Sequence, residues 1–93
     1  MEGGVRATIV ERLQAGFAPL RLEVLDESAA HAGHAGAAAG GGHFRVLVVS
    51  DAFAGLPRIE RHRLVYDAVR DLMPHRIHAL AIRALAPDED GGP

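Results

Sequence analysis

The second half of the chain combines three patterns that together restrict its fold. Residues 43–50 include an unbroken apolar run from Val46 to Val49, with Phe44 and Val46 on one face, which is typical of a buried strand. Residues 57–73 carry apolar side chains at helical spacing, and residues 77–85 return to an apolar, partly β-branched run. A strand, a helix and a strand in series predict a crossover connection, so we expect two parallel neighbouring strands.

The first quarter of the chain predicts one more helix and one more strand. Val5, Ile9, Leu13 and Phe17 recur every four residues, which places them along one face of an amphipathic helix. Residues 20–25 alternate apolar and charged side chains, as a half-buried strand does. The predicted order is α-β-β-α-β, and the fold class is α+β, a three-stranded mixed sheet with helices on one face.

The segment between the first two strands sets the domain organisation. Residues 29–42 consist of Ala, Gly and His alone, with no period, so we expect a mobile loop there. We also expect residues 1–4 and the acidic tail 87–93 to be disordered. Residues 5–86 then form one folded domain.

Composition excludes several classes of protein. The chain has no cysteine, so it offers no disulfide, no thiolate nucleophile and no thiolate metal ligand. A formal net charge of −2 argues against binding nucleic acid with the whole surface. With two serines and no glycine-rich phosphate loop, we expect no enzymatic activity. No apolar stretch reaches the roughly 20 residues that cross a bilayer, and the N-terminus lacks a signal-peptide pattern, so we expect a cytoplasmic location.

Six histidines are the most chemically versatile side chains of the sequence. Strict alternation along the last predicted strand places His78 on the same face as Leu80 and Ile82, where a histidine is more often a packed core residue than a ligand. His31 and His34 lie in the predicted loop at a spacing that could hold one metal ion. From the residues alone, packing and metal binding both remain open.

The start of the second predicted helix is basic, with Arg58, Arg61, His62 and Arg63 close together. Three interpretations fit this cluster: a solvated face whose charges pair along the helix, a docking surface for an acidic partner, or phosphate contacts with DNA. For DNA, the predicted binding residues are Arg61, Arg63 and Arg58.

Five motifs follow one another in an order that resembles the BolA-like family. They are Asp26-Glu27-Ser28, His43-Phe44-Arg45-Val46, Asp51-Ala52-Phe53-Ala54-Gly55, Arg61-His62-Arg63-Leu64-Val65-Tyr66 and His78-Ala79-Leu80-Ala81-Ile82. The resemblance covers nearly the whole chain, residues 5–86. It implies a fold similar to the class II KH domain.

The resemblance also implies a function in iron–sulfur metabolism. BolA-like proteins pair with monothiol glutaredoxins and share a [2Fe-2S] cluster with them, to which the glutaredoxin brings a cysteine thiolate and bound glutathione. By this resemblance His78 is one imidazole ligand and His31 the other, with His34 as the alternative loop ligand. The absence of cysteine is compatible with this role, because a chain without thiolates can complete a cluster that it cannot hold alone.

The resemblance leaves other hypotheses open. Gly40-Gly41-Gly42 replaces a more polar segment of many family members, which predicts a looser loop. His43 either orients this loop or is simply a strand-start residue, and we favour the second role. Some BolA-like proteins are regarded as transcriptional regulators, so DNA binding is the alternative function. A homodimer, and docking on glutaredoxin without supplying ligands, are the remaining hypotheses.

Overall fold

The protein is described by a computed structural model over residues 4–28, 42–73 and 75–90. Its elements in chain order are α1 (Gly4–Phe17), β1 (Arg21–Asp26), β2 (Gly42–Val49), the 3₁₀ turn η2 (Asp51–Phe53), α3 (Arg58–Ala68), the 3₁₀ turn η3 (Arg70–Leu72), β3 (Ile77–Leu85) and the 3₁₀ turn η4 (Pro87–Glu89). The predicted α-β-β-α-β order is confirmed. Within the described residues, no helix has the length and apolar character needed to span a membrane.

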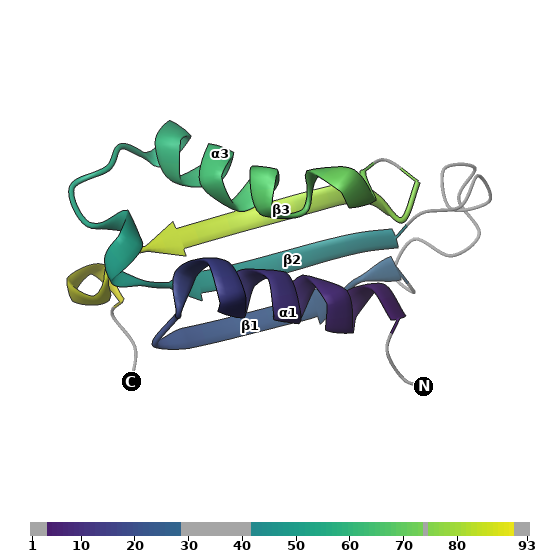
Figure 1. The fold of residues 1–93 in the computed structure, drawn as a ribbon, viewed down its shortest axis with the longest axis horizontal. Coiled ribbons are helices and arrows are strands. Elements are labelled where there is room, and N and C mark those ends of the chain that lie inside the picture. The colour runs from purple at the N-terminus through teal and green to yellow at the C-terminus, as the bar shows by residue number, and fades with distance from the viewer. Residues whose placement is uncertain (1–3, 29–41, 74, 91–93) are drawn as a thin grey trace.

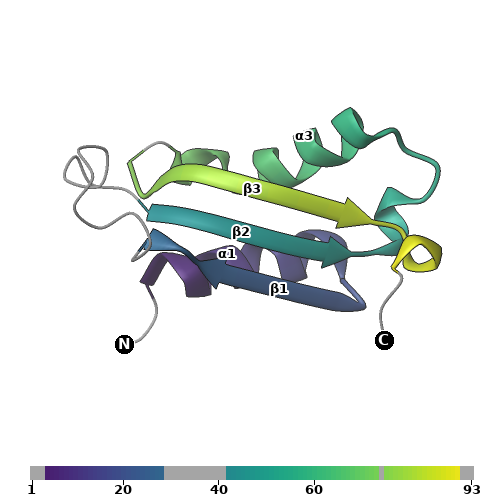
Figure 2. The same ribbon diagram turned by 180° about the vertical axis from the view of Figure 1, so that it is seen from behind.

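The three strands form one mixed sheet in the order β1-β2-β3. β1 and β2 are antiparallel, with Val24 opposite Val46, and β2 and β3 are parallel, with Val46 opposite Ile82. Both long helices cover the same face of the sheet (Figure 1), and the view from behind shows the other face open (Figure 2). The α+β class and the parallel pair expected from the crossover are therefore confirmed.

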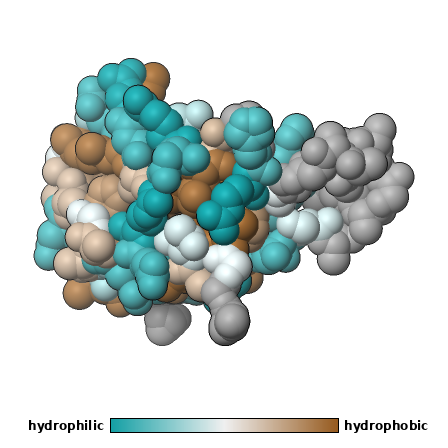
Figure 3. All heavy atoms as spheres, turned by 45° about the vertical axis from the view of Figure 1, so that its right-hand side comes forward, coloured by the Kyte–Doolittle hydropathy of each residue, from teal (hydrophilic) through white to brown (hydrophobic). Residues whose placement is uncertain are grey.

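The hydrophobic core lies between the two helices and the covered face of the sheet. Ile9 and Leu13 of α1 and Val65 of α3 are fully buried, as their helical spacing predicts. They pack with Phe44 and Val46 of the central strand. On the outer surface drawn in Figure 3, hydrophilic residues form a broad band with hydrophobic residues between them. The helices therefore turn their apolar faces inward onto a single layer of strands.

The second helix is shorter than its sequence pattern predicts. Residues 57–73 have helical spacing, but α3 ends at Ala68 and η3 follows. Val69 separates the two with φ −123° and ψ 14°, outside the helical region, although its side chain is fully buried. The apolar face continues to Leu72 because the 3₁₀ turn keeps both Val69 and Leu72 in the core.

One buried polar side chain joins three elements where β2 ends. Ser50 is 1% exposed, and its Oγ donates to the Phe17 carbonyl at 2.6 Å and accepts from the Ala52 N–H at 3.0 Å. Its own N–H donates to the Leu85 carbonyl of β3 at 2.9 Å. Ser50 therefore caps η2 and fixes the end of α1 against the sheet.

The limits of the folded part differ from the predicted ones. Gly4 and Gly42, which the sequence places in disordered or mobile segments, are the first residues of α1 and β2. Residues 87–90 are not a disordered tail: they include η4, and Asp90 pairs with Arg21 at 2.9 Å. The remaining parts of the predicted termini and loop, residues 1–3, 29–41 and 91–93, lie outside the described residues.

Replacing Ser50 with alanine tests the role of its hydroxyl. Ser50→Ala should lower the free energy of unfolding by about 1–3 kcal/mol, because buried backbone groups of Phe17 and Ala52 lose a partner. Urea denaturation followed by far-UV circular dichroism measures the change. Thr8→Ala is the control, since the exposed Thr8 hydroxyl donates only to Gly4 within its own helix. Equal losses for the two variants would contradict the role of Ser50.

Candidate functional site

The register of the β2–β3 pair breaks where both strands begin. Gly42 pairs with Ile77, but the next pair is His43 with Ala79, so His78 is an extra residue in β3. Such a bulge shifts the alternation of side chains along the strand that contains it. Ile77 is fully buried, whereas His78 is exposed.

This bulge corrects the predicted environment of His78. Strict alternation puts His78 on one face with Leu80 and Ile82, and that prediction is wrong. Leu80 and Ile82 pack against the core, and Ile77 joins the core in place of His78. His78 is therefore accessible to a ligand or a partner, rather than enclosed by apolar side chains.

His78 lies against a second histidine, the second residue of the neighbouring strand β2. The ring centroids of His43 and His78 are 5.3 Å apart, and the ring planes are inclined by 42°. His43 precedes the buried Phe44 in β2, so by strand alternation it belongs to the face that the helices leave open. The sequence does not predict that His43 lies beside His78, because the pairing of the two rings depends on a register break that no local pattern displays.

The Asp26-Glu27-Ser28 motif anchors the same end of the sheet. The Ser28 N–H donates to Asp26 Oδ1 at 2.9 Å, and hydrogen bonds from the side chain and backbone of Ser28 hold the pKa of the Asp26 carboxyl below its usual value. Ser28 Oγ in turn accepts from the His43 N–H at 3.1 Å. The Glu27 N–H donates to the His43 carbonyl at 2.7 Å, so the backbone of His43 is held on both sides.

A side chain at Gly42 would displace its neighbours. A Cβ there would lie 2.5 Å from the Phe44 ring and 2.9 Å from Ser28 Oγ, closer than real contacts allow. The Gly42 N–H donates to the Arg76 carbonyl at 3.0 Å, which ties β2 to the residue before β3. Gly42 is thus a fixed packing position in β2, although the sequence suggested a loose triple-glycine segment.

The predicted loop ligands His31 and His34 lie outside the described residues, so their roles stay predictions. The segment that contains them begins after Ser28 and ends before Gly42. Both of these residues lie at the end of the sheet where β3 begins and where His78 is found. Across residues 4–28, 42–73 and 75–90, no three histidine or acidic side chains form a group that could hold a metal ion.

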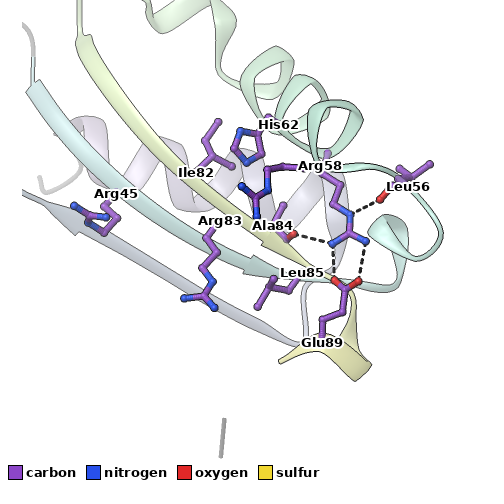
Figure 4. Close-up of a pocket in the computed structure, with 10 residues that line it drawn as sticks. Arg45, Leu56, Arg58, His62, Ile82, Arg83, Ala84, Leu85 and Glu89 are labelled. Atoms are coloured by element: carbon purple, nitrogen blue, oxygen red, sulfur yellow. Dashed lines mark hydrogen bonds and ion pairs between the residues drawn. The ribbon is translucent and has the colours of Figure 1, made fainter. Parts of the chain in front are cut away.

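At the opposite end of β3, Arg61 is occupied by internal contacts. Its Nε donates to the Leu56 carbonyl at 2.7 Å and its Nη1 to the Ala84 carbonyl at 3.1 Å (Figure 4). The guanidinium also pairs with both carboxylate oxygens of Glu89, and the side chain is only 11% exposed. The hydrogen bonds that Glu89 accepts from Arg61, and next the one from the Ala86 N–H, lower the pKa of its carboxyl to about 2. We call this set of contacts the Arg61 bridge.

A cleft of about 630 Å³ lies beside the Arg61 bridge and has a cationic lining. Arg58 and His62 reach it from α3, Arg83 from β3 and Arg45 from β2 (Figure 4). Within the described part of the chain, the side chains of Arg58 and Arg83 make no hydrogen bond or ion pair. Arg58 was predicted from the sequence as a binding residue, but Arg83 and Arg45 were not, because the fold brings them together from distant parts of the chain.

Comparison with known proteins finds relatives over most of the chain. Residues 13–89 match the family model described as BolA-like protein. The chain is 41% identical over 78 residues to the DNA-binding transcriptional regulator BolA of Escherichia coli, covering 84% of this chain and 71% of that protein. It is 42% identical over 85 residues to mouse BolA-like protein 1, covering 91% of this chain and 60% of the relative. The solved BolA domain of SufE1 from Arabidopsis thaliana matches with a TM-score of 0.81 at 42% identity, covering 96% of this chain and 99% of that one.

Because of the Arg61 bridge, the free energy of unfolding should depend on pH in the acid range. Because the pKa of Glu89 is about 2 in the folded chain against an ordinary 4.5, its ionised carboxylate stabilises the fold fully above pH 4.5. That stabilisation is lost as the pH falls toward 2. Glu89→Gln should therefore lower the Tm at neutral pH, and the difference from the original chain should shrink between pH 4.5 and pH 2. Thermal unfolding across this range measures it, with Asp88→Asn as control; a difference that does not change with pH would contradict the bridge.

Proposed function

The chain belongs to the BolA-like family, and we propose that it is an iron–sulfur accessory protein. It pairs with a monothiol glutaredoxin and completes a bridging [2Fe-2S] cluster through imidazoles, for transfer of the cluster to other proteins or for sensing iron. The observation that carries the proposal is the placement of His78. The bulge leaves its side chain exposed at one end of the sheet, where a partner can reach it.

The second ligand of the proposed site is His31, with His34 as the alternative. His31 is three residues from Ser28, which spans about 10 Å of extended chain. Ser28 Oγ holds the backbone of His43, whose ring lies 5.3 Å from that of His78. The chain length from this anchor therefore allows an imidazole at His31 to approach the His78 ring.

The donor set available from this chain fits a shared cluster and not a self-contained one. The sequence has no cysteine, and [2Fe-2S] clusters depend on thiolates, so these must come from the partner and its glutathione. Two imidazoles on one iron would give the cluster a higher reduction potential than four thiolates would. An imidazole binds metal only with its coordinating nitrogen deprotonated, so acid should release the shared cluster.

The His78 ligand is tested in the mixed complex. Adding this protein to a glutathione-loaded monothiol glutaredoxin that carries its [2Fe-2S] cluster should change the visible circular dichroism, because the ligand set changes. His78→Ala should abolish the new spectrum, while the apo proteins still associate by size-exclusion chromatography. His75→Ala is the matched control, an exposed histidine three residues earlier that should leave the spectrum intact. An unchanged spectrum with His78→Ala would refute the ligand assignment.

DNA binding is the second candidate function, and the cationic cleft is the observation that favours it. Arg58 and Arg83 stand there without ion pairs in the described structure, which suits contacts to phosphate oxygens. The Escherichia coli relative carries the name of a DNA-binding transcriptional regulator. Arg61 is a poor phosphate ligand in this arrangement because the Arg61 bridge uses its donors, whereas Arg63 is exposed on α3.

The paired substitution of Arg58 and Arg63 by alanine tests this second function. Each lost phosphate contact should weaken binding across all sequences and reduce the slope of log K against log salt by about 1. Fluorescence anisotropy with a labelled duplex at several salt concentrations gives that slope. The absence of binding by the original chain at low salt would dispose of DNA as a ligand.

A further inference from the structure

We infer that His43 and His78 form a two-imidazole site for one divalent transition-metal ion, which this chain binds by itself. The site is distinct from the predicted ligand pair, because it takes its second imidazole from β2 rather than from the segment between β1 and β2. It uses only residues whose positions the structure describes.

The distance between the two rings fits chelation of a single ion. Two imidazoles at ~2.0–2.1 Å from a tetrahedral zinc ion, measured from the metal to the nitrogen, place their ring centroids about 5 Å apart. The centroids of His43 and His78 are 5.3 Å apart, with the planes inclined by 42°. The separation of the two rings therefore matches that of two imidazoles on one ion.

The backbone on both sides of the pair is already fixed. The N–H of His43 is held by Ser28 and its carbonyl by Glu27, at 3.1 Å and 2.7 Å. On the other strand, the buried Ile77 fixes the residue before His78 in the core. Metal binding would thus order two side chains and leave the backbone unchanged, which keeps its entropic cost low.

The chemistry of the pair defines which ions it takes. Imidazole suits zinc, copper, nickel and iron, while magnesium and calcium prefer oxygen ligands. No third described histidine or acidic side chain completes the group, so solvent fills the other positions and the affinity is moderate. For such a site Cu²⁺ should bind more tightly than Ni²⁺ or Zn²⁺. An ion held there would occupy His78 and so compete with its ligation of a shared cluster.

Isothermal titration of the tag-free protein with Ni²⁺ at neutral pH tests the inference without any glutaredoxin. His43→Ala and His78→Ala should each weaken binding by about tenfold or more, because one imidazole cannot chelate. His75→Ala and His62→Ala, single exposed or half-buried histidines elsewhere, should bind like the original chain. His31→Ala and His34→Ala should also bind normally. Far-UV circular dichroism confirms that each variant is folded.

Two results would overturn the inference: no Ni²⁺ binding by the original chain, or binding that survives His43→Ala and is lost in the His31 or His34 variants. Should His43→Ala fail to fold, Co²⁺-induced shifts in the NMR spectrum of the original chain provide the second measurement. They should centre on the starts of β2 and β3, and a centre elsewhere would refute the site. Because no partner is present, failure here leaves the proposed cluster function standing, and failure of that function leaves this site standing.

Discussion

The core and the placement of His43 and His78 both depend on one constraint. This is the parallel pairing of β2 with β3, whose register shifts by one residue where the two strands begin. Parallel strands buried by helices demand apolar side chains on the covered face. Ile77 places an apolar side chain on the covered face at the first position of β3. Because of the bulge, the next residue of β3 to pack against the core is Leu80, three positions later. His78 is the extra residue of the bulge, and its side chain is exposed instead of joining the core. The exposure of a potential ligand therefore follows directly from the packing of the core.

The sheet consequently has two chemically different ends. At one end the motif around Ser28 and the close-packed Gly42 hold His43 beside His78. At the other end the Arg61 bridge joins α3 to the end of β3 and to η4, and the cationic cleft lies next to it. Proposed cluster binding and proposed DNA binding fall on these separate ends, so substitutions at one end should leave the other unaffected.

The helices and strands and their order could be predicted from the sequence, because each element depends on local periodicity. The four-residue spacing from Val5 to Phe17 and the alternation around Val46 predict α1 and β2 with little ambiguity. The resemblance to the BolA-like family identified the family correctly from motif order. The exposed side chain at His78 was not predictable from alternation, because a bulge depends on how two distant strands pair.

Charged residues were harder to interpret than apolar ones. In the sequence Arg61 looks like Arg58 and Arg63, three cations at the start of one helix. Only the fold brings Glu89 and the Ala84 carbonyl to Arg61 and makes it an internal structural residue. The same contacts give residues 87–90 a fixed position, although their acidic, proline-containing composition is typical of a free tail. Long-range ion pairs leave no local pattern from which either result could be predicted.

The central claim is that this chain presents the His78 imidazole to an iron–sulfur cluster. The most direct measurement is pulsed EPR of the reduced [2Fe-2S] complex with glutaredoxin, with ¹⁵N-histidine in this chain alone. The account predicts ¹⁵N couplings typical of imidazole bound to iron, with the His78 coupling lost when that residue is replaced by alanine. A spectrum that contains no ¹⁵N coupling from this chain would mean that the cluster is held entirely by the partner, and would contradict the account.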